Sequence, residues 1–457
     1  MKTSRTLRVL LATIAAPLAL HAQDTRTVTE PTIPPACTVL KAQLHATNGT
    51  FASEDNTQPD TTRIQSALDH CPKGQAVELA SDASSNAFLS GPLQLRTGVT
   101  LLVDKATTLY ASRNPKDFEV SPNSCGIINT STHPGCKPFL SATGPNIALM
   151  GDGIIDGRGN AKMTGTDQSW WDLPREIKLT GKGRQQVPRL IDTDHTDNLI
   201  FYRITLKNSA MTHIAVHHSN GVTVWGLKID TPATALNTDG FDPAASTNIT
   251  VTHSFIRDGD DNIAIKAGDG PVTHMSVLHN HFYSGHGMSI GSETTGGVST
   301  LLVRDLSLDG TTWGIRLKSN ATRGGIVDGA TYDDICIRNS KLPISVTTNY
   351  FLPGTTPDSL PVFKNILLHN VRISGGTRFE LNGFDPTHRL AIQFDNVQIT
   401  DNPTPYKSTI AHADITLGPG PVNLPLTGAE DSTLRGKPTS TTPAPCTDKF
   451  VPFPVTQ

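Results

Sequence analysis

The sequence has few charged residues and no long apolar run, and both shortages limit what it can form. Charged residues are 17% of the 457 residues, while glycine and proline together account for 70 (38 + 32). Such a composition favours turns and disfavours long helices, because glycine and proline both weaken a helix. The apolar stretch from Val9 to Leu20 covers 12 residues, too few to span about 30 Å of hydrocarbon. A membrane anchor is therefore not expected there.

The first 22 residues are instead typical of a secretory signal. Three basic residues, Lys2, Arg5 and Arg8, precede the short apolar stretch, and Ala22 offers a small residue for cleavage. We expect residues 1–22 to be removed on export, which leaves 23–457 as a single domain. Removal takes the net charge from −3 to −6, since three positive charges and no negative ones are lost. A protein of that sign is not expected to bind nucleic acid, and an anionic ligand would have to be held by local cations.

The sequence also lacks a CxxC spacing, which argues against a zinc site. Its six cysteines form an even set, and export to an oxidising compartment favours disulfides. Proximity in sequence pairs Cys37 with Cys71 and Cys125 with Cys136, which leaves Cys336 and Cys446. Six cysteines allow 15 connectivities, so this pairing is a hypothesis.

What the sequence does contain is a repeat. Seven segments begin with a small or polar residue, alternate apolar and other positions, and reach an apolar residue eight places on. They start at Asn198, Gly221, Asn248, His274, Thr300, Gly329 and Asn365, at intervals of 23, 27, 26, 26, 29 and 36 residues. The alternation predicts strands with one buried face. Propeller blades need about 40 residues, and a β-sandwich needs strands every 8 to 12, so a period near 25 favours an all-β parallel β-helix.

The ends of the chain differ from this repeat. Residues 60–71 place Ile64, Ala67 and Leu68 at helical spacing, which predicts a helix that caps the hydrophobic end of the solenoid. We expect an N-terminal cap over 37–100, regular coils over about 145–400, and an extended tail over 401–457 that is rich in proline, threonine and glycine.

Four polar motifs follow the apolar segments. They are Asn237-Thr238-Asp239-Gly240, Gly259-Asp260-Asp261-Asn262, Gly285-His286-Gly287 and Arg316-Leu317-Lys318. Asp260 and His286 each lie 12 residues beyond a coil start, so stacking should bring them one rung apart, roughly 5 Å. Lys318 and Asp239 share an offset of 18 in the same way. Asp260 and Asp261 can serve one site if the backbone turns at Gly259.

Clustered carboxyls cannot all ionise independently, so they suit acid/base chemistry such as the hydrolysis of a glycosidic bond. Arg316 and Lys318 suit an anionic sugar, because arginine can bind a carboxylate with two hydrogen bonds. Calcium is a competing ligand for Asp239, Asp260 and Asp261. The two nearby cations oppose it.

The four motifs, in this order and spacing, resemble the signature set of the polygalacturonase family of glycoside hydrolases. The stretches that begin at Gly259 and Gly285 resemble its bacterial members, and the resemblance covers roughly residues 145 to 375. It implies a right-handed parallel β-helix, in agreement with the repeat. It also implies hydrolysis of the α-1,4 linkages of polygalacturonate with inversion, for which acid and base carboxyls about 6.5 to 9.5 Å apart are expected.

By the same resemblance, Asp260 is the general acid, and Asp239 and Asp261 together are the base that activates water. His286 supports the acid. The expected substrate-binding residues are Asn237, Arg316, Lys318 and Tyr350.

We therefore expect a monomeric polygalacturonase that acts on pectin outside the cell or in the periplasm. No cofactor, metal, nucleic acid or membrane partner is expected after signal cleavage. Endo action is preferred to exo action, although segments 100–145 and 340–364 could close one end of a groove. Another pectin-backbone hydrolase of the same family, a pectate lyase and a noncatalytic carbohydrate-binding β-helix are the other candidates. Calcium-dependent, ultraviolet-absorbing products would indicate the lyase, and binding without cleavage would indicate the noncatalytic protein.

Overall fold

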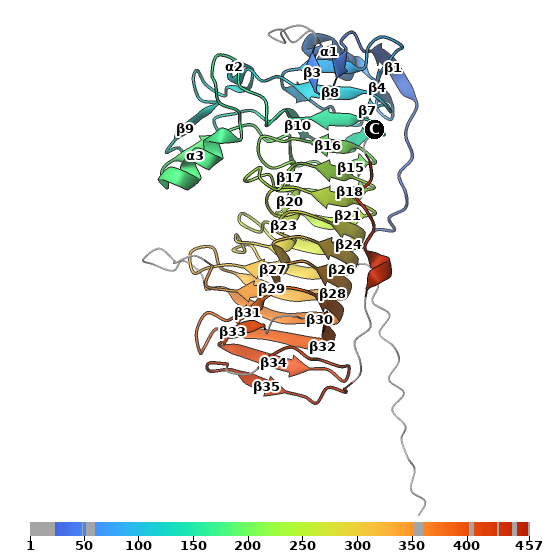
Figure 1. The fold of residues 1–457 in the computed structure, drawn as a ribbon. Coiled ribbons are helices and arrows are strands. Elements are labelled where there is room, and N and C mark those ends of the chain that lie inside the picture. Colours follow the sequence, from blue (N-terminus) through green and yellow to red (C-terminus); the bar gives the residue numbers. More distant parts are fainter. Residues whose placement is uncertain are drawn as a thin grey trace, which may run out of the picture.

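The computed structural model describes residues 23–47, 49–51, 60–350, 360–401, 406–426, 429–440 and 446–455. The expected signal, residues 1–22, lies outside them. The chain winds into a right-handed parallel β-helix, the all-β fold that the repeat predicts (Figure 1). Two long sheets of 20 and 11 strands line its sides, and all strand pairs within them are parallel. None of the helices in the described parts is long and apolar enough to cross a membrane.

In the 20-stranded sheet, many of the coils before β24 (Val272–Phe282) contribute two short strands each. From β24 onward these two strands are joined into one long strand of the sheet. Its members are β1 (Ala36–Lys41), β4 (Ala76–Ala80), β5 (Ala87–Ser90), β7 (Thr100–Val103), β8 (Thr108–Ala111), β11 (Ala148–Met150), β12 (Ile154–Asp156), β15 (Leu199–Tyr202), β16 (Thr205–Lys207), β18 (Asn220–Trp225), β19 (Lys228–Asp230), β21 (Thr247–Thr252), β22 (Phe255–Arg257), β24 (Val272–Phe282), β26 (Val298–Asp309), β28 (Ile326–Arg338), β30 (Val362–Ser374), β32 (Leu390–Asp401), β34 (Ala413–Leu417) and β35 (Thr433–Arg435).

The 11-stranded sheet takes one strand from each coil. Its members are β6 (Leu93–Gln94), β10 (Leu140–Thr143), β14 (Ile191–Asp194), β17 (Ile214–His217), β20 (Phe241–Ala244), β23 (Ile263–Ile265), β25 (Met288–Ile290), β27 (Trp313–Lys318), β29 (Leu342–Thr347), β31 (Arg378–Asn382) and β33 (Lys407–Ala411). The remaining elements are the antiparallel pairs β2 (Ala46–Thr47) with β3 (Thr50–Phe51) and β9 (Ile127–Asn129) with β13 (Arg184–Gln186), the helices α1 (Thr61–His70), α2 (Pro115–Phe118) and α3 (Asp172–Thr180), and the 3-10 turn Thr447–Lys449.

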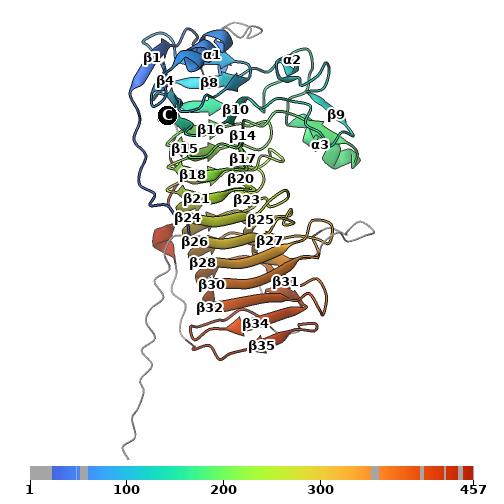
Figure 2. The same cartoon turned by 180° about the vertical axis from the view of Figure 1, so that it is seen from behind.

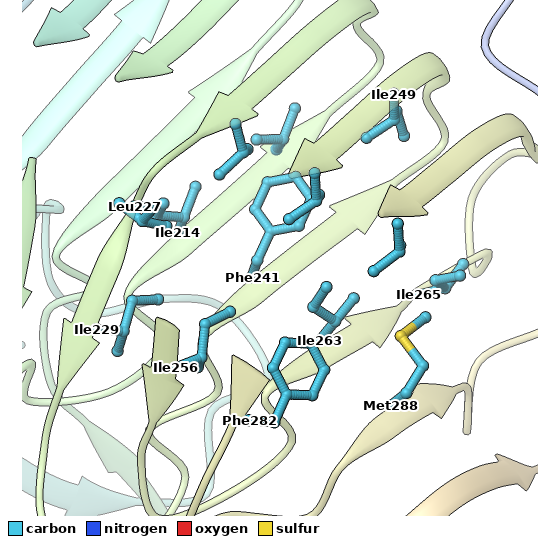
Figure 3. Packing of buried hydrophobic residues seen from close by; sticks show 14 of the residues in the cluster. Ile214, Leu227, Ile229, Phe241, Ile249, Ile256, Ile263, Ile265, Phe282 and Met288 are labelled. Carbon is cyan, nitrogen blue, oxygen red and sulfur yellow. The ribbon is translucent and has the colours of Figure 1, made fainter. Parts of the chain in front are cut away.

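Buried side chains stack in register along the inside of the solenoid. Phe241, Ile263 and Met288 are direct partners on β20, β23 and β25, and Figure 3 shows them following one another through the core. Each is fully buried, and burying an apolar side chain of this size stabilises a fold by about 1.5–3 kcal/mol. This inward stack fixes the register of the sheet, so the outward residues between its members are fixed as well.

Helix α1 closes the N-terminal end of the stack, as predicted (Figure 1). Its residues Ile64 and Leu68 are buried in the core. The Asp60 carboxylate just before the helix accepts a hydrogen bond from the Leu89 amide at 2.7 Å and pairs with Arg63. These contacts tie the helix to the first coils.

The solenoid is longer than the repeat in the sequence indicates. Parallel strands begin at Ala36, well before the expected start near 145, and continue to Arg435, inside the expected tail. In the early coils, insertions separate neighbouring strands, as between β7 and β11, where α2 and β9 intervene. Such insertions hide the period without breaking the stack.

Both end segments lie along one flank of the solenoid (Figures 1 and 2). Near the N-terminus, the Asp24 amide donates to Ser276 Oγ at 3.1 Å. Near the C-terminus, the Phe453 ring contacts Tyr283 edge-on at 5.3 Å, and Cys446 is bonded to Cys336. The other two disulfides, Cys37–Cys71 and Cys125–Cys136, are also present, so all three predicted pairs are confirmed.

Candidate functional site

A cleft of about 700 Å³ lies over the outer face of the 11-stranded sheet. Its lining is dominated by charged residues, which include Arg184, Arg189, Asp239, Asp242, Asp260, Asp261, Lys266, Asp269, Glu293, Lys318 and Arg323. Asn237 and Tyr350 line it too. The cleft continues into a second cavity of about 430 Å³ beside β13, and the two share Arg184, Arg189, Met211 and Asn237.

The core register explains why these residues meet. Phe241, Ile263 and Met288 are aligned on β20, β23 and β25. Asp239, Asp261 and His286 each stand two residues earlier, where the chain enters its strand. Strands in a sheet lie about 4.8 Å apart, so these three residues follow one another on successive coils, and Asp239 and Asp261 line the cleft.

Asp260 and His286 are neighbours, as their shared offset predicts. His286 Nδ1 lies 3.0 Å from Asp260 Oδ1, and the same oxygen accepts the Asp261 amide at 2.9 Å. The His286 amide also bonds to the Asp260 carbonyl at 2.6 Å. Among the described residues, no hydrogen bond reaches the other oxygen, Asp260 Oδ2. Since Asp260 lines the cleft, this oxygen remains for a ligand.

Asp261 is held in a different way. Its Oδ2 accepts from Lys318 Nζ at 2.6 Å, and its Oδ1 accepts from Arg316 Nη1 at 3.0 Å and from Ser289 Oγ at 2.7 Å. Burial opposes the charge, but Lys318 and Arg316 outweigh it and hold the pKa of Asp261 well below its usual range. The two cations therefore favour the ionised form of Asp261.

The carboxyl of Asp239 lies in a third environment, beside a lysine. It is paired with Lys266, whose Nζ lies 3.7 Å from Asp239 Oδ2. Burial, with the nearby charges of Asp242 and Asp260, raises the pKa of Asp239 well above its usual value. The cluster thus contains one carboxyl that stays ionised and another that readily keeps a proton.

Sequence reasoning missed Asp242 and Lys266. Asp242 points into the cleft from β20, and burial raises its pKa to about 7 although Lys266 opposes the shift. Burial disfavours the Lys266 cation, but Asp239 and Asp242 raise its pKa above the usual value. Both follow the predicted motifs closely, at outward positions of β20 and just after β23, so the alternation of the strands could have identified them.

Asp258 was missed as well. It is fully buried beneath the loop, and its Oδ1 accepts the Asp260 amide at 3.2 Å. Its Oδ2 is buried without a hydrogen-bond partner among the described residues. Burial, followed by the charges of Asp239 and Asp260, raises the pKa of Asp258 well above its usual value. A side chain at Gly285 would clash here, because its Cβ would lie 2.5 Å from Asp258 Oδ1.

Arg316 contacts two aromatic residues, Trp313 and Tyr350, of which Tyr350 lines the cleft. The Arg316 guanidinium stacks on the Trp313 ring at 3.9 Å, and its Nη2 lies 3.5 Å from the Tyr350 hydroxyl. Arg316 and Lys318 are 4% and 5% exposed. They were expected to grip a substrate carboxylate, but both bind Asp261, and of the two Lys318 lines the cleft.

One oxygen each of Asp260 and Asp261 and one ring nitrogen of His286 lie within 4.8 Å of one another, a spacing that a metal ion could use. Both oxygens of Asp261 already accept from cations, which oppose a second positive charge. The same geometry places Asp260 closer to Asp261 than the about 6.5 to 9.5 Å expected between an inverting acid and base.

Comparisons with known proteins indicate a family of glycosyl hydrolases. The family model described as glycosyl hydrolases family 28 matches residues 99–416. An endo-polygalacturonase of Pectobacterium carotovorum subsp. carotovorum is 41% identical, with 84% of this chain and 91% of that protein covered. A polygalacturonase of Ralstonia solanacearum is 36% identical, with 97% of each covered. The solved structure of a polygalacturonase from Erwinia carotovora ssp. carotovora matches with a TM-score of 0.76 at 36% identity, and covers 86% of this chain and 99% of that one.

The matched range of the family model takes in more than half of the chain and all four polar motifs. The relatives are matched over nearly their whole length. The chain therefore belongs to glycosyl hydrolases family 28.

Proposed function

We propose that this protein is a secreted endo-polygalacturonase that hydrolyses the α-1,4-galacturonosidic linkages of polygalacturonate, the backbone of pectin. Family membership and similarity to an endo-polygalacturonase support the reaction and the substrate. The cleft also offers local partners to an anionic chain, because five cations line it beside the acidic residues: Arg184, Arg189, Lys266, Lys318 and Arg323.

The observation that carries the proposal is the unequal environment of two adjacent carboxyls. Asp261 has both oxygens bound by cations, whereas Asp260 has Oδ1 bound by His286 and Oδ2 without a partner among the described residues. Hydrolysis of a glycosidic bond needs one carboxyl that gives a proton and one that stays charged. Asp261, held by two cations, suits the charged role, and Asp260, with Oδ2 directed to the cleft, is proposed to give the proton.

In the proposed reaction, Asp260 Oδ2 donates its proton to the glycosidic oxygen as the bond to the anomeric carbon breaks. His286 fixes the orientation of this carboxyl through Oδ1. A water molecule attacks the anomeric carbon from the opposite face, and its proton passes to Asp239 and Asp261, which together are the base. Asp261 supplies the negative charge that attracts this proton. Asp239 supplies a second oxygen that orients the water.

The cations have two proposed tasks. Lys318 and Arg316 keep Asp261 ionised, and Lys318, as a cleft residue, also faces the carboxylate of a bound galacturonate. Tyr350 and Asn237 line the cleft on either side of the acidic cluster and are proposed to contact the sugar rings. Tyr350 is positioned for this role by its contact with Arg316.

Endo action is supported by the shape of the cleft. It continues past Asn237 into the cavity beside β13, so a sugar chain has room to extend beyond the acidic cluster on that side. An exo-acting enzyme would need one end of the groove closed, and this end is open. The protein is further proposed to be exported and to act as a monomer. The mass of the mature protein would show where its N-terminus lies and so test export, and light scattering in solution would test the monomer.

The deciding experiment is release of reducing sugar from polygalacturonate in the presence of a chelator, with the products sized at early times. The proposal expects mixed oligomers at once and no dependence on the chelator. Monomer or dimer alone would indicate exo action, and unsaturated products that need calcium would indicate a lyase. Binding of polygalacturonate without cleavage would indicate a noncatalytic protein and overturn the proposal.

A further inference from the structure

A second group of convergent side chains lies at the rim of the cleft, outside the acidic cluster. Asp194 ends β14, His195 follows it, and His218 follows β17 on the next coil. Asp269, which lines the cleft, stands beside His218. Asp194 and His217 are direct partners in the sheet, so the two turns that carry the histidines are stacked on each other.

Three ligand atoms meet in this group. Asp194 Oδ1 lies 2.9 Å from His195 Nδ1 and 2.8 Å from His218 Nδ1. The two imidazole rings stack with their centroids 4.9 Å apart. One ligand atom from each of the three residues lies within 4.8 Å of the others, and all three residues are exposed. A cation from solvent can therefore reach all three.

The partners of His218 suit a protonated ring, or a neutral ring that binds a cation. Its Nε2 lies 3.3 Å from Asp269 Oδ2 while its Nδ1 faces Asp194 Oδ1, so each ring nitrogen meets a carboxylate. A neutral imidazole has one N–H, and an ionised carboxylate accepts only. If Nε2 donates to Asp269, the lone pair of Nδ1 faces an oxygen lone pair. A metal ion between them turns this repulsion into two coordinate bonds.

The second carboxylate completes a recognised arrangement. In metal sites, a histidine ligand usually donates its other N–H to a carboxylate, which fixes the tautomer and the ring. Asp269 is in that position for His218. Two imidazoles with one carboxylate match the ligand preference of zinc and similar transition metals, whereas calcium and magnesium prefer an all-oxygen set.

We propose that Asp194 Oδ1, His195 Nδ1 and His218 Nδ1 bind a divalent transition metal, with Asp269 orienting His218. The metal links the turns after β14 and β17 at the rim of the cleft and leaves its remaining coordination position to water. Its role is to hold these coils together. This inference does not depend on the proposed hydrolysis.

The test is zinc binding to the purified, chelator-treated protein, measured by calorimetry and by the zinc-induced change in melting temperature. A matched control exists in the 20-stranded sheet. There, His253 and His279 have ring centroids 5.2 Å apart, and His279 Nδ1 lies 2.6 Å from Asp305. Asp305, however, already accepts from Lys449 Nζ at 2.6 Å, so this pair should not bind metal.

The wild-type protein and the His253→Ala/His279→Ala variant should bind zinc alike and melt at a higher temperature with it. The His195→Ala/His218→Ala variant should bind it at least tenfold more weakly and show no zinc-dependent rise. Cobalt should give visible absorption in the same two proteins only. Equal binding by all three, or no binding to the wild type, overturns the proposal. Circular dichroism of each variant without metal checks that it is folded.

Discussion

The Lys318 ammonium lies 2.6 Å from Asp261 Oδ2, and both side chains are almost fully buried. Arg316 binds the other oxygen of the same carboxylate. Two cations on one buried carboxylate fix its charge and its position, so Asp261 cannot move toward a substrate. In the proposed reaction, water is therefore expected to bind beside Asp261 and act between it and the sugar.

Asp260→Asn and Asp261→Asn are expected to separate activity from stability. Both should lower kcat for polygalacturonate at least about 100-fold, since each removes one half of the acid/base pair. Only Asp261→Asn should also lower the free energy of unfolding, by about 3–5 kcal/mol, because it leaves Arg316 and Lys318 buried without their counter-charge. Kinetics and chemical denaturation of the two proteins measure this. A loss of activity below tenfold in Asp260→Asn would remove it from the role of acid.

Lys318→Met is expected to move the acid limb of the pH profile. Lys318 and Arg316 depress the pKa of Asp261, so removing one cation raises that pKa. The acid limb of kcat/KM should therefore shift to higher pH. Arg323→Met, which removes a charge from the cleft but pairs with Glu293 at 2.7 Å, is the matched control and should not shift it.

The pairing of Asp261 with Lys318 and Arg316 also predicts how the free energy of unfolding depends on pH. The sign of this dependence follows from the depressed pKa of Asp261. Asp261 stabilises the folded state fully above its unfolded pKa, about 3.9, and this contribution is lost as pH falls toward the lower folded value. The free energy of unfolding of the wild type should fall with acidification below about pH 4 more steeply than that of Asp261→Asn. Parallel pH dependence in the two proteins would contradict the depressed pKa.

Asp258 is expected to act as a positioning residue for the Asp260 loop. Asp258→Ala should lower kcat roughly tenfold or more with little change in KM, since the Asp260 amide loses its acceptor. Asp258→Asn keeps that acceptor and should retain activity and an unshifted pH profile. Asp156 is the control, because it is similarly buried and accepts the Arg158 amide two residues on at 2.8 Å. Asp156→Ala should alter stability alone.

Much of this site could be predicted from the sequence, because the repeat supplies a register. Asp260 and His286 share an offset in their coils, and they are in contact. The offset that linked Lys318 to Asp239 fails to describe the contacts, because coil lengths differ. Lys266 occupies the place beside Asp239, and Lys318 binds Asp261.

The missed residues could not be identified from the sequence, and the physical reason is the same for each. A single aspartate or lysine on a strand, such as Asp242 or Lys266, is indistinguishable in sequence from a solvated one until its neighbours on adjacent coils are known. Asp258 was hidden similarly, because its burial comes from the glycines packed against it. The early coils escaped detection because insertions such as the one that holds α2 and β9 interrupt their period.

The stereochemistry of the product is the sharpest test of the water-mediated reaction. The Asp260 and Asp261 oxygens approach within 4.8 Å, a spacing nearer to that of retaining pairs, about 5–5.5 Å, than to that of inverting ones. A retaining enzyme would use Asp261 as a nucleophile on the anomeric carbon. Both of its oxygens are bound by cations, which lower its reactivity, and Asp239 lies nearby to help hold water. Inversion is therefore expected, so proton NMR during the first turnovers should detect the β-anomer at the new reducing end. Early appearance of the α-anomer would instead assign Asp261 to a covalent intermediate.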